Sequence, residues 1–282
     1  MRLGRPLHHP FEREDPASWV KAMQASGCPA AYCPLPHDPL PEDALIEAYR
    51  QAAEAADILI AEVGVWHVNP ISPDADTREA GITAIARGLE LAEKIGANCC
   101  VALAGSLSEA WAAPHRDHFR PETIDRIVGT VREIIDRVKP VRTAFGIEAM
   151  PWVPPESPER YVEILEKVDR DAAACHLDPV NITTSPVLAA NSAAFIDRCF
   201  DLLGDKIVSA HAKDIRLSGE LTVHLSECAP GEGWLDYPQY LRRLNALDRD
   251  VPLMIEHLKT ADEYDAAEAH IRQIADGLGI EA

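Results

Sequence analysis

Thr143 to Asp178 reads TAFGIEAMPWVPPESPERYVEILEKVDRDAAACHLD, and this stretch decides the fold. It begins and ends with a short apolar run, and each run finishes on a carboxylate, Glu148 in the first and Asp178 in the second. Between the runs, Ser157 is a good helix cap and Pro158 suits the first helical position, ahead of apolar residues at helical spacing. This order predicts a parallel β-α-β unit, because near-continuous apolar strands belong to sheets that helices cover.

The same alternation of apolar runs and helical stretches continues towards both ends of the chain. Runs typical of buried parallel strands lie at 57–63, 98–103, 206–211 and 251–256, and weaker ones lie at 2–7 and 30–33. Helical spacing, with proline at several starts and glycine or proline at several ends, predicts helices at 16–26, 41–56, 77–95, 121–138, 186–203, 237–247 and 261–278.

Counting the weak run at 2–7 gives eight strand–helix units, the number that closes a barrel of roughly 250 residues. That run holds a proline and two arginines, so the count depends partly on the expected total. An open doubly wound sheet is the alternative, but no glycine-rich phosphate turn follows any strand. No linker rich in glycine, serine or proline divides the chain. We therefore expect an α/β fold, a single (β/α)8 TIM barrel over residues 1–282.

Composition argues against several classes of protein. A hydrophobic share of 47% with 26% charged residues is typical of a globular protein with an ample core. The formal net charge of −19 disfavours a surface that follows nucleic-acid phosphates. No apolar run approaches the ~20 residues of a membrane helix, and the polar, proline-bearing start is unlike a signal peptide. Seven scattered cysteines without a CxxC pair indicate a reduced compartment, so we expect a cytoplasmic protein without nucleic-acid or membrane partners.

Four polar residues stand where apolar strands end: Glu148, Asp178, His211 and Glu256. Successive members are 30, 33 and 45 residues apart, about one strand–helix unit each, with a long loop in the last interval. Because reactive groups gather at the carboxyl ends of barrel strands, we expect these side chains to converge at one side of the barrel mouth.

This group of three carboxylates and one imidazole predicts a site for one divalent metal ion. Oxygen-rich ligands with one nitrogen suit Mn²⁺ first, then Mg²⁺ or Co²⁺, and can accept Zn²⁺. Three carboxylates close together repel one another and raise their pKa values, and a cation resolves that conflict. The alternative for any one of them is a helix cap or a salt-bridge partner.

Other side chains are candidates for contact with the substrate. His176 lies two residues before Asp178 and faces the same way, as a partner of the site or as a satisfied core histidine. Lys213 could bind an anionic or carbonyl oxygen, or pair with a ligand carboxylate. The remaining candidates are Asn181 on the loop above the metal, and Trp66 and His67 after the third strand, where packing beneath a loop is the alternative.

The chain resembles the sugar phosphate isomerase/epimerase family of xylose isomerase-like TIM barrels. The resemblance lies in Gly146-Ile147-Glu148, His176 to Asn181 (HLDPVN), His211 to Asp214 (HAKD), Gly231-Glu232-Gly233 and Ile255-Glu256, in the family's order. It implies that Glu148, Asp178, His211 and Glu256 hold the metal. It further implies that Glu148 and Glu256 are catalytic, one removing a proton next to a carbonyl and the other returning it through a metal-stabilised enediolate.

A divalent-metal-dependent isomerase or epimerase of a sugar or keto-sugar is therefore the leading interpretation, and the family admits a homo-oligomer. A lyase or decarboxylase acting on a sugar-derived acid with the same site is the second. A DNA-repair enzyme of the endonuclease IV type shares the barrel, but it needs more histidine ligands and a basic face. A non-catalytic sugar-binding or accessory barrel is the last alternative, since a fold alone does not set the function.

Overall fold

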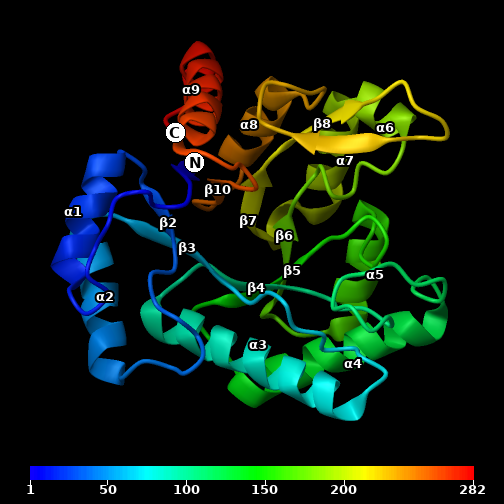
Figure 1. The fold of residues 1–282 in the computed structure, drawn as a ribbon, viewed down its shortest axis with the longest axis horizontal. Coiled ribbons are helices and arrows are strands. Elements are labelled where there is room, and N and C mark those ends of the chain that lie inside the picture. Colours follow the sequence, from blue (N-terminus) through cyan, green and yellow to red (C-terminus); the bar gives the residue numbers. More distant parts are fainter.

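The strands of the computed structural model, which describes residues 1–282, close into a parallel barrel (Figure 1). Around the barrel their order is β1-β10-β7-β6-β5-β4-β3-β2. Their bounds are Arg2–Gly4 (β1), Ala30–Tyr32 (β2), Leu59–Gly64 (β3), Cys99–Leu103 (β4), Ala144–Glu148 (β5), Ala173–Leu177 (β6), Ile207–Ala212 (β7) and Pro252–Ile255 (β10). The predicted eight-stranded barrel is confirmed, including the weak first strand, which pairs with β10 from Arg2 to Gly4 and closes the ring.

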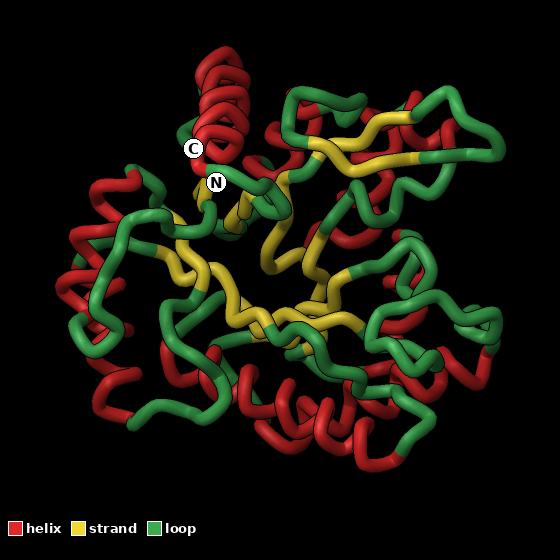
Figure 2. The backbone as a smooth tube through the Cα atoms, in the orientation of Figure 1, coloured by secondary structure: helices red, strands yellow, loops and turns green.

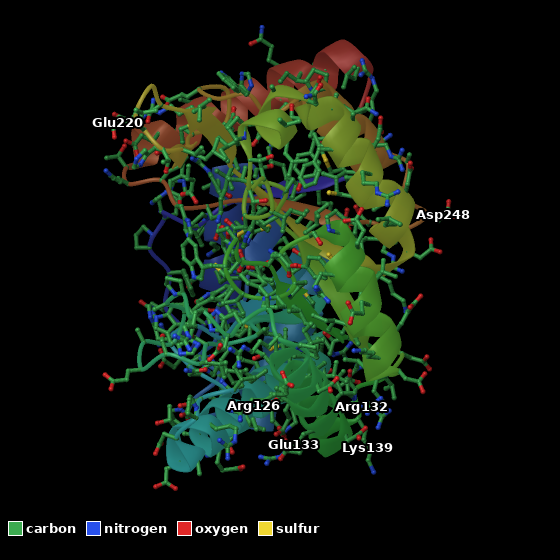
Figure 3. All side chains as sticks on the ribbon, turned by 90° about the vertical axis from the view of Figure 1, so that its right-hand side faces the viewer. Arg126, Arg132, Glu133, Lys139, Glu220 and Asp248 are labelled. Carbon is green, nitrogen blue, oxygen red and sulfur yellow. The ribbon has the colours of Figure 1, made fainter.

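Helices surround the ring of strands, as the tube in Figure 2 shows. They are Pro16–Ser26 (α1), Asp43–Ala55 (α2), Ala75–Ile95 (α3), Pro121–Val138 (α4), Pro158–Val168 (α5), Pro186–Ala190 (α6), Ser192–Leu203 (α7), Tyr237–Asn245 (α8) and Ala261–Leu278 (α9), with a 3₁₀ turn at Gly204–Lys206. Charged residues such as Arg126, Arg132 and Glu133 lie on the outward side of α4, and its apolar residues are buried (Figure 3). No helix combines the length and the hydropathy that crossing a membrane requires.

One predicted helix is wrong. The stretch 186–203 forms two helices, α6 and α7, which meet at Asn191. The side chain of Asn191 donates to the carbonyl of Val187 at 2.8 Å, and its backbone leaves the helical region at φ −117° and ψ 37°. Asparagine offers the backbone such a competing hydrogen bond, which disfavours it inside helices.

A two-stranded antiparallel hairpin in the long interval before β10 was not predicted. It consists of β8 (Asp214–Leu217) and β9 (Leu225–Cys228), with Glu220 in the connecting loop. Figure 3 shows Glu220 and Asp248 on opposite sides of the molecule. No residue of β9 is buried, so it lacks the apolar signal of a core strand.

The side chains on the inner faces of the strands belong to a different cluster from those on the outer faces. Along β4, Cys100 and Ala102 belong to the large core of 65 buried residues, whereas Cys99 and Val101 belong to a separate cluster of four. Because side chains alternate along a strand, the first set packs against the helices and the second faces the barrel interior. The interior thus holds small apolar groups, which leave room for long polar side chains.

Glu93, in the last turn of α3, anchors the chain just before β5. Its Oε2 accepts the backbone N–H groups of Val141, Arg142 and Thr143 at 3.1, 2.9 and 3.1 Å. Burial opposes ionisation, but these three donors outweigh it and lower the pKa of Glu93.

We expect Glu93→Gln to lower the free energy of unfolding by about 1–3 kcal/mol at pH 7, because charged acceptors form stronger hydrogen bonds. Because the pKa of Glu93 is lower in the folded state, its ionised form stabilises the fold. This contribution is fully present above the ordinary glutamate pKa of 4.5, and it is lost as the pH falls through the pKa that Glu93 has in the folded protein. Urea unfolding of both proteins at pH 7 and below pH 4 measures this. A difference that stays constant with pH would contradict the assignment.

Candidate metal centre

The carboxyl ends of four neighbouring strands bring together one residue each: Glu148 at the end of β5, Asp178 after β6, His211 within β7 and Glu256 after β10. We call these residues the four-donor group. One oxygen or nitrogen of each lies within 4.8 Å of the others. Nδ1 of His211 lies 2.8 Å from Glu256 Oε1, 3.2 Å from Glu148 Oε1 and 3.7 Å from Asp178 Oδ2. Three carboxylates thus face the same nitrogen.

The local chain orients these side chains. Asp178 Oδ1 accepts the backbone N–H groups of Val180 and Asn181 at 2.9 and 3.1 Å, so that Oδ2 is left to face the centre. The hydroxyl of Tyr240 donates to the carbonyl of His211 at 3.0 Å and ties β7 to α8. Glu148, Asp178 and His211 are buried, and only 12% of the Glu256 side chain is exposed. The four side chains are therefore largely shielded from solvent, and contacts within the chain orient them.

Lys213 reaches into the four-donor group from just beyond β7. Its Nζ lies 2.6 Å from Glu256 Oε1 and 2.9 Å from Asp178 Oδ2, and only 1% of the side chain is exposed. The same atom lies 3.4 Å from the amide oxygen of Asn181, whose Nδ2 donates to Glu148 Oε1 at 3.2 Å. The structure therefore places Lys213 and Asn181, both predicted to contact the substrate, directly against the carboxylates of the four-donor group.

Burial and mutual attraction set the charge states. Burial raises the pKa of Glu148. Burial acts in the same direction on Glu256, but His211 and Lys213 outweigh it and lower the pKa of Glu256 to about 2. Lys213 and His211 likewise hold the pKa of Asp178 well below its ordinary value. For His211, the carboxylates overcome burial and raise its pKa well above the ordinary value. The carboxylates thus favour a positive charge between them, a demand that a metal ion would also meet.

The residues present fit a divalent cation. Glu148, Asp178 and Glu256 supply three negative charges when ionised, and Lys213 offsets one of them. The remaining two charges match those of a divalent ion. Asp178 Oδ2 and Glu256 Oε1 are buried, and both face the Lys213 ammonium and the His211 ring. Oxygen atoms of buried carboxylates that converge on one point in this way suit a divalent ion.

His176 lies deeper in the barrel than a substrate-contacting residue is expected to. Its ring meets that of His211 edge-on with centroids 4.0 Å apart, and it is fully buried. Neither of its ring nitrogens has a hydrogen-bond partner, so it is not a satisfied core histidine either. Burial, and then the neighbouring His211, lower the pKa of His176 to about 4.

The side chains of Trp66 and His67, although adjacent in the sequence, lie in different surroundings. The Trp66 indole occupies the space that a side chain at Gly64 would take, where a Cβ would come within 2.5 Å of its Nε1. Trp66 packs on the inner cluster that contains Cys99 and Val101. His67 has a positive φ of 64°, is exposed, and contacts the ring of Trp111. Only Trp66 packs on the barrel interior.

Glu62 on β3 is a site residue that the sequence interpretation missed. It is 1% exposed and forms a second group of possible metal ligands with His176 and His211. The signal is present in the sequence, because a charged residue interrupts the apolar run at 57–63. Glu227 on β9 was also missed, and it lies 3.4 Å from Lys213 Nζ. No feature of the sequence around Glu227 marks it as part of the site.

Residues 19–276 match the sequence model of a protein family described as "xylose isomerase-like TIM barrel". The chain belongs to this family. Membership agrees with the resemblance seen in the motifs around the four-donor group. A search of curated proteins finds none that matches the chain.

Several solved structures share the fold of this chain. Endonuclease IV from Thermus thermophilus is 15% identical with a TM-score of 0.74, covering 98% of this chain and 100% of that one. D-psicose 3-epimerase with D-tagatose from Clostridium cellulolyticum is 16% identical with a TM-score of 0.67, covering 97% and 99%. A xylose isomerase-like TIM barrel protein from Mycobacterium smegmatis in complex with magnesium is 16% identical with a TM-score of 0.67, covering 98% and 95%. At these identities the comparisons show the fold alone.

Proposed function

We propose that this protein is a divalent-metal-dependent isomerase or epimerase of a sugar or keto-sugar. The observation that carries the proposal is the four-donor group, in which the oxygens of Glu148 and Glu256 both lie within 3.2 Å of His211 Nδ1 at the barrel mouth. Two glutamates at one centre can serve as a proton acceptor and a proton donor for the same carbon.

The roles of the chain's own residues follow from their surroundings. Glu148 and Glu256 lie at the same centre, so one can remove a proton from the substrate carbon and the other can return it, and the two exchange roles in the reverse reaction. Asp178 and His211 complete the ligand set. The metal ion, for which Mn²⁺ remains our prediction, would polarise the substrate carbonyl and stabilise negative charge on its oxygen.

The residues around the four-donor group are placed to bind the substrate. Lys213 and Asn181 present an ammonium and an amide at the four-donor group, where they can hold hydroxyl or carbonyl oxygens. Trp66 offers a flat apolar surface that suits the carbon face of a sugar ring. One of the structural neighbours is named a D-psicose 3-epimerase with D-tagatose, which supports a small keto-sugar as the substrate class.

The proposal is tested by proton exchange. Protein loaded with Mn²⁺ is incubated in deuterated water with a panel of keto-sugars, and NMR follows deuterium entering carbon-bound positions. We expect exchange and epimer formation that a chelator abolishes and Mn²⁺ restores. Products that lose carbon dioxide or water would instead identify the lyase alternative, which shares the same proton removal. Absence of both exchange and product across the panel would contradict the proposal.

A further inference from the structure

A buried carboxylate lies on the side of His211 that faces away from the four-donor group. Glu62 Oε1 lies 3.5 Å from His211 Nε2, while the three ligand carboxylates lie on the Nδ1 side of the ring. Neither Glu62 Oε1 nor His211 Nε2 has a hydrogen-bond partner. Glu62 and His211 are 1% and 0% exposed, so water does not serve either atom from the surface.

Glu62 is itself held in place from β7. Its Oε2 accepts the hydroxyl of Ser209 at 3.1 Å, and Ser209 stands two residues before His211 on the same strand. Nδ1 of His176 lies 3.5 Å from this same Oε2, and the His176 ring meets the His211 ring edge-on. These contacts leave Oε1 directed at the His211 ring.

We propose that Glu62 is a positioning residue that fixes the tautomer of His211 for metal binding. An imidazole that coordinates through Nδ1 must carry its proton on Nε2, and an acceptor at Nε2 stabilises that form. Glu62 Oε1 supplies the acceptor inside the barrel, where no other partner reaches Nε2. Carboxylates that accept from ligating histidines typically contribute about 10- to 100-fold to metal affinity. This inference rests on the proposed metal centre.

The alternative occupant of this space is a second ion held by Glu62, His176 and His211, since these three residues also offer clustered ligand atoms. A second ion would require the His211 ring to give up its Nε2 proton while Nδ1 serves the first ion. A hydrogen bond to Glu62 requires no such loss. We therefore assign Glu62 to His211 and treat the second ion as a result that would overturn the assignment.

A graded pair of variants tests the role. Glu62→Gln keeps an oxygen acceptor but loses the charge, whereas Glu62→Leu removes both and leaves a side chain that suits a buried site. Titration with Co²⁺, followed by visible absorption and chelator competition, gives affinity and stoichiometry. We expect one ion per chain, bound about 10-fold more weakly by Glu62→Gln and about 100-fold more weakly by Glu62→Leu. Glu93→Gln is the matched control, because Glu93 accepts backbone donors far from the centre, and we expect its Co²⁺ affinity to be native.

A spectroscopic measurement separates positioning from a general loss of structure. In ¹⁵N-histidine-labelled protein loaded with Zn²⁺, the native chain should show His211 protonated on Nε2, with that signal shifted or lost in Glu62→Leu. Native affinity in a folded Glu62→Leu variant would overturn the inference while leaving the metal centre intact. Two ions per native chain would overturn it as well. A native chain that binds no ion would overturn the proposed function together with this inference.

Discussion

Glu148→Gln and Glu256→Gln are each expected to lower epimerisation by about 10³-fold or more, which is within the range for loss of a general acid or base. Both glutamates lie beside His211 Nδ1, so each is placed to act on a substrate held at the same centre. A reaction with two bases has a signature that a reaction with one base lacks. Each variant keeps the glutamate that serves one epimer, and so it should still exchange the carbon-bound proton of that epimer with solvent.

The measurement is deuterium incorporation by NMR, with the two epimers supplied separately and Mn²⁺ at saturation, because both glutamates are also proposed ligands. We expect the two variants to show opposite preferences between the epimers, with little interconversion in either. Glu159→Gln is the matched control, since Glu159 lies on the surface in an ion pair with Arg198 and should leave the rate unchanged. Near-native epimerisation by either site variant would refute the two-base assignment. The assignment would also fail if a metal-loaded variant lost proton exchange equally with both epimers.

The sequence predicted the barrel because its strands carry a strong local signal. Buried parallel strands appear as continuous apolar runs, and helix starts such as Ser157-Pro158 carry their own capping chemistry. The structure places the helix start there, with the Ser157 hydroxyl accepting from the Arg160 N–H. The hairpin lacks such a signal, because none of the residues of β9 is buried and its pairing depends on β8 alone.

The residues of the four-donor group could be found from the sequence for a related reason. A carboxylate at the end of an apolar run, as at Glu148, marks the mouth of the barrel whichever way the strands are staggered. Glu62 lies inside its strand, and whether it faces the barrel interior depends on register. The pairing of β2 with β3 shifts between Ala31 and Tyr32, just where Tyr32 meets Glu62. The alternation of side chains read from sequence does not locate such an irregularity.

His67 shows a second limit of the sequence interpretation. It follows Trp66 directly, and both were expected to contact the substrate. The backbone at His67 takes a left-handed conformation with φ 64°, and its side chain is exposed and contacts Trp111. Histidine adopts a positive φ more often than most residues, as asparagine and aspartate do, but nothing in the sequence around His67 marks it as the residue that takes this conformation.

Asp178→Asn is expected to weaken metal binding by more than about 100-fold, beyond the effect of a residue that only orients a ligand. The substitution keeps an oxygen to accept from Val180 and Asn181, so the loop after β6 should hold its shape. It removes one of three negative charges while Lys213 remains within 2.6 Å of Glu256. The divalent ion and the Lys213 ammonium would then carry three positive charges against the two negative charges of Glu148 and Glu256. The excess of one positive charge opposes ion binding.

Thermal or urea unfolding with and without Mn²⁺ measures this effect through linkage. An ion at 100 times its dissociation constant adds about 2.7 kcal/mol to the free energy of unfolding. At that concentration the native protein should gain this amount, and Asp178→Asn should gain less than about 0.5 kcal/mol if its affinity is at least 100-fold weaker. Asp136→Asn is the control, because Asp136 on α4 is half exposed in an ion pair with Arg170, which lies in the loop after α5, and this variant should gain as much as the native protein. Equal stabilisation of Asp178→Asn would place the ion elsewhere, because the carboxylate at the end of β6 would then not be a ligand.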